Sequence, residues 1–552
     1  MKVSSKLASL IQSQTAMLGV QLGAGFVVIG LIFWKLQFST DAICCGDFDG
    51  YYHIKWSRML WESMRDQSFP PIFTWLPFTT LNPNDYVDHH LLFHIFQIPF
   101  TWFSDLRFGA KLASVLFATL AVTSCYWLLL RYKVRYPLLW LLGLLACSVP
   151  FLFRLNMAKA PPFAIFYLII GIHLLFKKKY WPLVPLSFVF ALTYDMFVLL
   201  LLAGFFWTTV LVITEHRFQW RPLAWMVIGM LAGFVLNPYF PDNLQLFYEH
   251  LKVKITLSGF TTSVGQEWYP YNSWEFLGNS LVACIAMVVG YIFFEVSERK
   301  RSHYSLFFLL FSTALMIMTA RWKRMAEYWP PFAILFSAFS IQPWLQGTRS
   351  IFSRLPREIL AELQPYLDLQ KEQDETETAN QAPSDIRDLV QTISVAVVAV
   401  ILGVVMFFNL SKTVEDISSS SPHDYYKAGG EWMRTNITSP QTIFNTDWDD
   451  FPRLFYYDPA HNYVSGLDPA YLYEADPALS RLYERITLGD EEDPGPLIRE
   501  HFGARYVFTD KGHDKFYNNA IESGWFDKVY EDDDCTILQI RDYKAEPPAE
   551  EP

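Results

Sequence analysis

The stretch DFDGYYH, residues 47–53, follows directly on an apolar segment of about residues 16–36. Lysines precede that segment, and because positive charge stays on the cytoplasmic side of a membrane, we expect the stretch to emerge on the opposite side. Asp47 and Asp49 repel each other at this spacing, so such a pair commonly holds a cation or takes part in proton chemistry. If the stretch is helical, His53 shares a face with Asp49, as in a metal site. A solvated acidic loop is the alternative interpretation.

The composition is that of a polytopic membrane protein with an acidic soluble region. Of the 552 residues, 52% are hydrophobic and 17% aromatic, and apolar runs recur up to Asn409. From Leu410 onward there are 29 acidic residues against 13 Lys and Arg, whereas the preceding part has 26 against 31. An acidic surface of this kind does not suit nucleic acid as a partner. The six cysteines show no spacing typical of a metal site, and we expect Cys44, Cys45 and Cys535 to be exposed.

Apolar length predicts eleven membrane crossings and a cytoplasmic N-terminus, as in a multi-pass protein of the cell membrane. Residues 91–103 are apolar but too short to cross, so we expect them to lie along the membrane surface as a helix. With this assignment the basic cluster at residues 131–135 falls on the cytoplasmic side, as do the clusters that follow it. The expected crossings are at about residues 16–36, 108–130, 138–152, 163–176, 183–193, 197–214, 223–239, 276–294, 305–320, 331–344 and 389–410.

The soluble region has the pattern of an α/β domain. Residues 426–435 suit a helix, and residues 442–445, 504–509 and 536–540 suit strands. The predicted parts of the chain are a transmembrane domain (1–344, with outer loops 38–107 and 240–275), a polar cytoplasmic linker (345–387), a last crossing (388–410) and an extracytoplasmic acidic α/β domain (411–552).

Polar residues that suit a ligand gather in the segments expected outside. Asp88 and His89 precede the surface helix, and Asp and His together are good ligands for a divalent ion. Capping of that helix by Asn84 or Asp85 is the structural alternative. Glu267 lies in a long polar and aromatic loop, the makeup of a loop that closes over a substrate.

Basic residues also occur on the expected outer side, against the usual bias. Arg321 and Arg324 lie there, and binding of an anion such as a phosphate would explain their placement; contact with lipid headgroups is the alternative. Arg154 and Lys159 occupy the second outer turn, where they suit an acidic partner, a phosphorylated ligand, or simply the membrane surface.

The soluble region carries the acidic turn DWDD, residues 447–450, directly after its first predicted strand. Ligand contacts in α/β folds gather at the carboxyl ends of strands, and a plain solvated turn is the alternative.

Taken together, these motifs resemble the GT-C membrane glycosyltransferases, and in particular the catalytic subunit of oligosaccharyltransferase in its single-subunit bacterial and archaeal forms. The resemblance covers much of the chain in layout and only short stretches in residues. It implies a GT-C fold with an outer α/β domain. The residues that carry it are Asp49 with Arg58, Ser263-Val264 with Glu267, EWMRTN at 431–436 and FNTDWDDF at 444–451.

By this resemblance, Asp49, Asp47 and Glu267 would be the catalytic carboxylates. They would hold a divalent cation, Mn²⁺ or Mg²⁺, with help from Asp88 or His89. The donor would be a sugar or oligosaccharide on a polyprenyl phosphate or pyrophosphate in the membrane lipid, and the acceptor a protein. The residues facing the donor phosphates would be Arg154, Lys159, Arg321 and Arg324, and those recognising the acceptor Trp448 and Asp449.

Two other functions are weighed against this one. The first is transfer of the sugar to a lipid or polysaccharide instead of a protein. The second is membrane transport, but transporters usually carry ionisable residues inside their crossings and show internal repeats, whereas here the ionisable residues gather in the outer loops and no repeat is evident.

Overall fold

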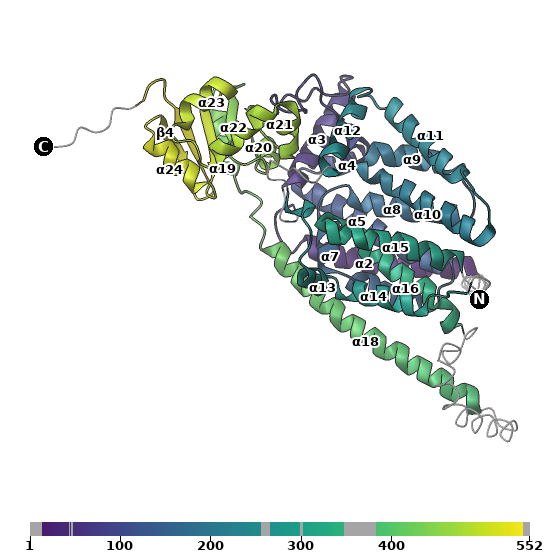
Figure 1. Ribbon diagram of the computed structural model, residues 1–552. Coiled ribbons are helices and arrows are strands. Elements are labelled where there is room, and N and C mark those ends of the chain that lie inside the picture. Colours follow the sequence, from purple (N-terminus) through teal and green to yellow (C-terminus); the bar gives the residue numbers. More distant parts are fainter. Residues whose placement is uncertain are drawn as a thin grey trace, which may run out of the picture.

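The computed structural model describes residues 14–43, 45, 48–255, 265–297, 302–346 and 382–544. A bundle of helices forms one domain, a long helix runs along its edge, and a smaller domain with a sheet lies beyond one end of the bundle (Figure 1). The α-helices of the bundle and its edge are α2 (Gln14–Gln37), α3 (Asp49–Arg65), α4 (Leu91–Gln97), α5 (Leu106–Arg131), α6 (Pro137–Ala146), α7 (Val149–Asn156), α8 (Pro161–Phe176), α9 (Leu183–Thr193), α10 (Val198–Glu215), α11 (Arg221–Val235), α12 (Asp242–Ile255), α13 (Ser273–Asn279), α14 (Leu281–Phe293), α15 (His303–Arg321), α16 (Trp329–Leu345) and α18 (Ala382–Ser418).

All eleven apolar segments predicted to cross the membrane coincide with helices. Within the described ranges, α2, α5, α10 with the turn before it, α15 and α18 are each long and apolar enough to span a membrane. Two bent pairs, α6 with α7 and α13 with α14, raise the number of such spans from five to seven, and α8, α9 and α11 are shorter apolar helices. The polytopic membrane class is confirmed, while the number of crossings and their orientation stay predictions.

Helix α3 forms the seam between the two domains because one of its faces is aromatic and apolar. Tyr52, Trp56 and Leu60 recur every four residues, the spacing of one helix face, and none is more than 5% exposed. They belong to a core shared with Phe455 and Tyr463 of the C-terminal domain. Burying side chains of this size contributes about 2–3 kcal/mol each, so the two domains are held by a continuous core.

The C-terminal domain is built on a five-stranded sheet of order β2-β1-β3-β5-β4. Strand β1 is parallel to β2 and β3, while β5 is antiparallel to β3 and β4. The α/β prediction is confirmed, with the predicted strands and helix found within one or two residues of their expected positions. The elements are α19 (Lys427–Asn436), β1 (Thr442–Asn445), α20 (Phe451–Tyr457), β2 (Asn462–Tyr463), α21 (Pro469–Ala475), α22 (Pro477–Thr487), α23 (Pro494–Phe502), β3 (Tyr506–Asp510), α24 (Asp514–Glu522), β4 (Phe526–Glu531) and β5 (Cys535–Ile540).

One buried arginine joins the domains. Arg453 of α20 is 1% exposed, and its guanidinium donates to the carbonyl oxygens of Pro422 and Tyr425 at 2.7 and 3.1 Å. The same group lies over the rings of Phe48 and Tyr51 at 4.2 and 4.7 Å from their centroids. The hydrogen bonds hold the segment before α19 within the C-terminal domain, and the ring contacts bind that domain to the start of α3.

Two cysteines expected to be exposed are buried instead. Cys535 carries a free thiol and is 0% exposed, because it opens β5, which lies inside the sheet between β3 and β4. Cys45 is also 0% exposed and is disulfide-bonded. Cys44 lies outside the described residues.

Candidate active site

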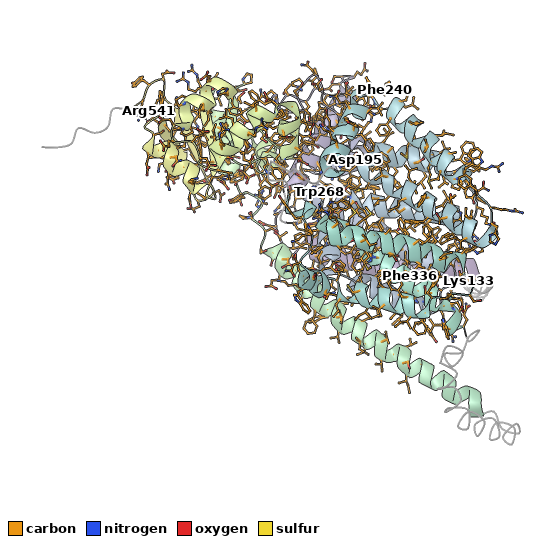
Figure 2. The ribbon with its side chains drawn as sticks, viewed as in Figure 1. Lys133, Asp195, Phe240, Trp268, Phe336 and Arg541 are labelled. Carbon is orange, nitrogen blue, oxygen red and sulfur yellow. The ribbon has the colours of Figure 1, made fainter. Side chains whose placement is uncertain are left out.

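A cavity of about 530 Å³ lies where the helical bundle meets the C-terminal domain. One wall comes from the start of α3, the turn between α7 and α8, and two short 3-10 turns, η3 (Gln266–Trp268) and η4 (Lys323–Glu327). The other wall comes from the turn after β1 and the start of α21. Figure 2 shows two of its lining residues, Asp195 and Trp268, toward the C-terminal domain, and Lys133 at the far end of the bundle.

Asp49 is paired with a lysine at the edge of this cavity. It opens α3, where the unpaired N–H groups of a helix N-terminus favour a carboxylate. Its Oδ2 lies 2.8 Å from Nζ of Lys159, in the turn between α7 and α8. Because the two side chains are only 23% and 14% exposed, this pair is less screened by water than a surface ion pair.

Glu267 lies between two guanidinium groups. Its Oε2 accepts a hydrogen bond from Nη2 of Arg154 at 2.6 Å, and its Oε1 accepts one from Arg324. Burial alone would raise the pKa of this carboxyl, but Arg324 and Arg154 hold the pKa well below its ordinary value. Glu267 is therefore ionised and pairs the two arginines across the cavity wall.

Glu327 completes this network and is not among the residues predicted from the sequence. It is 1% exposed, and its Oε1 accepts from Nε of Arg154 at 2.6 Å. Arg324 in turn donates to the hydroxyl of Tyr194 at 2.9 Å. The sequence offers one signal for Glu327, which follows an apolar helix and lies three residues after Arg324. An acid that becomes buried in such a position requires a basic partner.

A chain of hydrogen bonds leads from a buried carboxylate to the cavity. Asp88 accepts from Nε1 of Trp56 at 3.0 Å and from Nδ1 of His94 at 2.8 Å. The second ring nitrogen of His94 lies 2.8 Å from Nδ1 of His53, and His53 lines the cavity. Burial, and then His94, lower the pKa of His53 well below its ordinary value, so His53 is neutral. His94 is not among the predicted site residues, whereas His53 of the DFDGYYH stretch is expected to share a helix face with Asp49.

The turn after β1 brings Trp448 and Asp449 to the cavity. The buried side chain of Asn445, the last residue of β1, shapes this turn by donating to the carbonyl oxygens of Asp447 and Ser465 at 2.7 and 2.8 Å. A polar side chain inside the domain thereby fixes the path of the turn, because each of these buried groups requires a partner.

The cavity brings together most of the predicted site residues. Asp88 lies behind it, 2% exposed and engaged by its two neighbours, and Arg321 is exposed at the end of α15. Asp47 and the Ser263-Val264 part of the loop before Glu267 lie outside the described residues. The predicted residues that line the cavity are Asp49, His89, Arg154, Lys159, Glu267, Arg324, Trp448 and Asp449.

A divalent ion at Asp49 does not fit the described residues. The Asp49 carboxylate is matched by Lys159, and Glu267 by two arginines. In the described part of the chain, the group of three or more potential ligands with their atoms within 4.8 Å consists of other residues, namely Asp447, Asp510 and His513.

Comparison with known proteins identifies the fold. No protein-family model and no curated protein sequence matches the chain. The archaeal oligosaccharyltransferase AglB from Archaeoglobus fulgidus, in complex with an inhibitory peptide and a dolichol-phosphate, is similar with 13% identity and a TM-score of 0.57, over 91% of this chain and 71% of that chain. ArnT from Cupriavidus metallidurans in the apo state is similar with 12% identity and a TM-score of 0.56, over 94% of this chain and 98% of that one. At such identities the likeness concerns the fold, and it agrees with the resemblance seen in the sequence. The chain thus has the GT-C fold of the membrane glycosyltransferases.

Proposed function

We propose that the protein is a glycosyltransferase that moves a sugar or oligosaccharide from a polyprenyl phosphate or pyrophosphate to a protein acceptor on the outer face of the membrane. The observation that carries the proposal is one cavity that joins Asp49, the paired arginines around Glu267, and the turn with Trp448. The ligand class is supported by two neighbours in fold, since the AglB structure holds a dolichol-phosphate and a peptide, and a structure of ArnT with a TM-score of 0.51 holds undecaprenyl phosphate.

The donor phosphate binds by exchange with Glu267. Arg154 and Arg324 are already neutralised by Glu267 and Glu327, so an incoming phosphate must displace one of these carboxylates to reach the guanidinium groups. The Glu327 side chain is 1% exposed, whereas the Glu267 side chain is 22% exposed and faces the cavity. Glu267 is therefore the exchangeable partner, and planar guanidinium groups suit a phosphate as well as a carboxylate.

The proposed reaction places negative charge on the leaving phosphate. The acceptor attacks the anomeric carbon, the bond from that carbon to the phosphate oxygen breaks, and the electron pair leaves with the phosphate. Arg154 and Arg324 stabilise that charge. The proton of the acceptor passes to a carboxylate of the cavity wall, Asp49 or Asp449.

The positive charge beside Asp49 is supplied by Lys159 in this proposal. An ammonium 2.8 Å from a carboxylate orients that carboxylate and adds to the field at the phosphate, as a bound cation does. The predicted Mn²⁺ or Mg²⁺ is accordingly assigned no step at Asp49.

The test compares the glycans of cells that carry the wild-type gene with those of cells that carry Asp49→Ala. We expect loss of a protein-linked glycan and accumulation of its lipid-linked precursor, because in this proposal Asp49 faces the reacting atoms. The Asp49 side chain is partly exposed, so its removal should leave the fold intact. Asp66→Ala is the matched control, an exposed acid directly after the other end of α3 that should leave glycosylation intact.

Other outcomes would redirect the proposal. Loss of a modified lipid or polysaccharide with glycoproteins untouched would keep the reaction and change the acceptor class. Unchanged glycoproteins, lipids and polysaccharides would refute glycosyl transfer and favour transport.

A further inference from the structure

A second polar site lies at the carboxyl edge of the sheet. Strands β1 and β3 are parallel neighbours, paired from Ile443 with Tyr506 to Asn445 with Phe508, so both chains leave the sheet at the same edge. The turn after β1 carries Asp447 and Asp450, and the segment after β3 carries Asp510 and His513.

Three of these side chains are close enough to share an ion. One ligand atom each from Asp447, Asp510 and His513 lies within 4.8 Å of the others, and all three side chains are partly exposed, so a solvated ion has access. Three ligand atoms spread evenly around a common ion, each about 2.1 Å from it, are at most about 3.6 Å from one another, so binding closes the longest separation by up to about 1 Å.

Asp450 gives independent support for a cation here. It is 3% exposed, and its Oδ2 is buried without a hydrogen-bond partner. Asp450 belongs to the same turn after β1 as Asp447 and follows it by three residues. A buried oxygen without a partner, beside two further acids, is the environment that a positive charge stabilises.

No Lys or Arg of the described residues forms an ion pair with Asp447, Asp450 or Asp510. The neighbouring Lys511 is directed away and donates to Glu531 and Thr536, each at 3.0 Å. His513 pairs with Asp510 and is the one basic group in this cluster, so the negative charge exceeds the positive charge available.

We propose that Asp447, Asp510 and His513 bind a divalent transition-metal ion, such as Mn²⁺ or Zn²⁺, at a site distinct from the cavity residue Asp49. Two carboxylates and an imidazole suit these ions, whereas Ca²⁺ and Mg²⁺ prefer oxygen ligands alone.

The ion would position the turn that faces the acceptor. Asp447 immediately precedes Trp448 and Asp449, which line the cavity, while Asp510 and His513 belong to the segment after β3. A metal shared by these two segments fixes the turn relative to the sheet. Asp447 and His513 are therefore positioning residues for the acceptor, and this role rests on the proposed function. Binding of the ion is independent of the proposed function.

The binding test uses the full-length protein in detergent, stripped of metal with EDTA and titrated with MnCl₂ while free Mn²⁺ is counted by electron paramagnetic resonance. We expect one bound Mn²⁺ per wild-type chain and at least a tenfold weaker affinity in the double variant Asp447→Asn, Asp510→Asn. His513→Gln, which keeps all the acids, should weaken binding as well. The matched control is His501→Gln with Asp514→Asn, which should bind as the wild type does.

The variant Asp49→Ala separates this site from the catalytic cavity and should still bind one Mn²⁺. Absence of stoichiometric binding of both Mn²⁺ and Zn²⁺ to the wild type, or equal binding by the wild type and a folded double variant, would overturn the proposal, as would loss of binding in Asp49→Ala. If the ion binds as expected but no glycosyl transfer is found, the site stands and the proposed function fails. If both hold, EDTA should raise the KM for the acceptor severalfold and leave the KM for the donor unchanged.

Discussion

Asp49 is paired with Lys159, whereas Asp47, the other acid of the DFDGYYH stretch, lies outside the described residues. A partly buried carboxylate is stabilised by a positive neighbour, and either a metal ion or an ammonium can supply that charge. Which of the two is present depends on a side chain more than a hundred residues away in the sequence. Spacing within one motif does not contain this information.

Replacement of Lys159 tests its role at the level of a single charge. Lys159→Ala should lower the transfer rate about a hundredfold, the typical effect of losing one electrostatic contact to a developing charge, and Lys159→Arg should retain more activity. The measurement is the initial rate with a lipid-linked donor, with and without added Mn²⁺. Added Mn²⁺ should partly restore Lys159→Ala, whose Asp49 lacks its counter-ion, while full activity of Lys159→Ala without metal would contradict the assignment.

The site residues that sequence analysis identified and those it did not differ in one physical respect. Asp49, Arg154, Lys159, Glu267, Arg324 and the Trp448-Asp449 turn sit in segments whose charge or polarity contrasts with the flanking apolar runs. Glu327 and His94 lie within or next to apolar segments and gain their roles through partners far along the chain. Such pairings follow from packing and leave little trace in local pattern.

At the scale of elements, hydrophobic periodicity predicted well which helices and strands are present. It predicted poorly how deeply individual polar residues are buried. The apolar segments became helices, and β1 was expected at its observed residues, since both rest on local patterns. Asp88 is predicted as a ligand of a divalent ion, but the packing of α3 against α4 buries it with Trp56 and His94. Burial of a polar residue depends on which helices meet.

The contact between α3 and α4 predicts how stability depends on pH. His53 stays neutral in the folded protein because burial and His94 lower its pKa, whereas in the unfolded chain it titrates near 6.5. Below pH 6.5 the unfolded state therefore binds an extra proton, and the folded state loses up to about 1.4 kcal/mol for each pH unit of further acidification. The pKa of Asp88 is lowered from 3.8, so its contribution remains present in this range and is lost only at lower pH.

The measurement is the unfolding temperature of the wild type and of His53→Gln from pH 8 to pH 5. We expect the difference between the two proteins to change steadily below pH 6.5, with the wild type falling more steeply. The other groups facing His53, namely His89, His94 and Lys159, are present in both proteins, so their titration largely cancels. Parallel curves would show that His53 is protonated in the folded protein.

At the scale of the whole molecule, the cavity depends on the junction held by Arg453. Arg453→Met keeps the length of the side chain but leaves the carbonyl oxygens of Pro422 and Tyr425 without their donor. We expect a loss of about 2–4 kcal/mol in the free energy of unfolding. Transfer activity should also be lost at temperatures where the wild type is active, because the two cavity walls separate.

The control for this junction is Arg499→Met, since Arg499 is about a third exposed on α23 and pairs with the exposed Asp542. Its unfolding free energy should change by less than about 0.5 kcal/mol. The comparison uses thermal unfolding and transfer rates of both variants in the same detergent. Equal stability of Arg453→Met and the control would exclude Arg453 as the residue that holds the junction.

The two walls of the cavity are also synthesised at different times. The first wall is complete once Arg324 has been added, and Trp448 of the second wall follows about 120 residues later, so a ribosome completes the first wall before it begins the second. Under the proposed function, a growing chain that has inserted its helices already has the arginines for the donor but has no surface to receive an acceptor. Such an enzyme would gain its activity only when its last domain has been made and has folded, and it would not modify other proteins while it is itself being made.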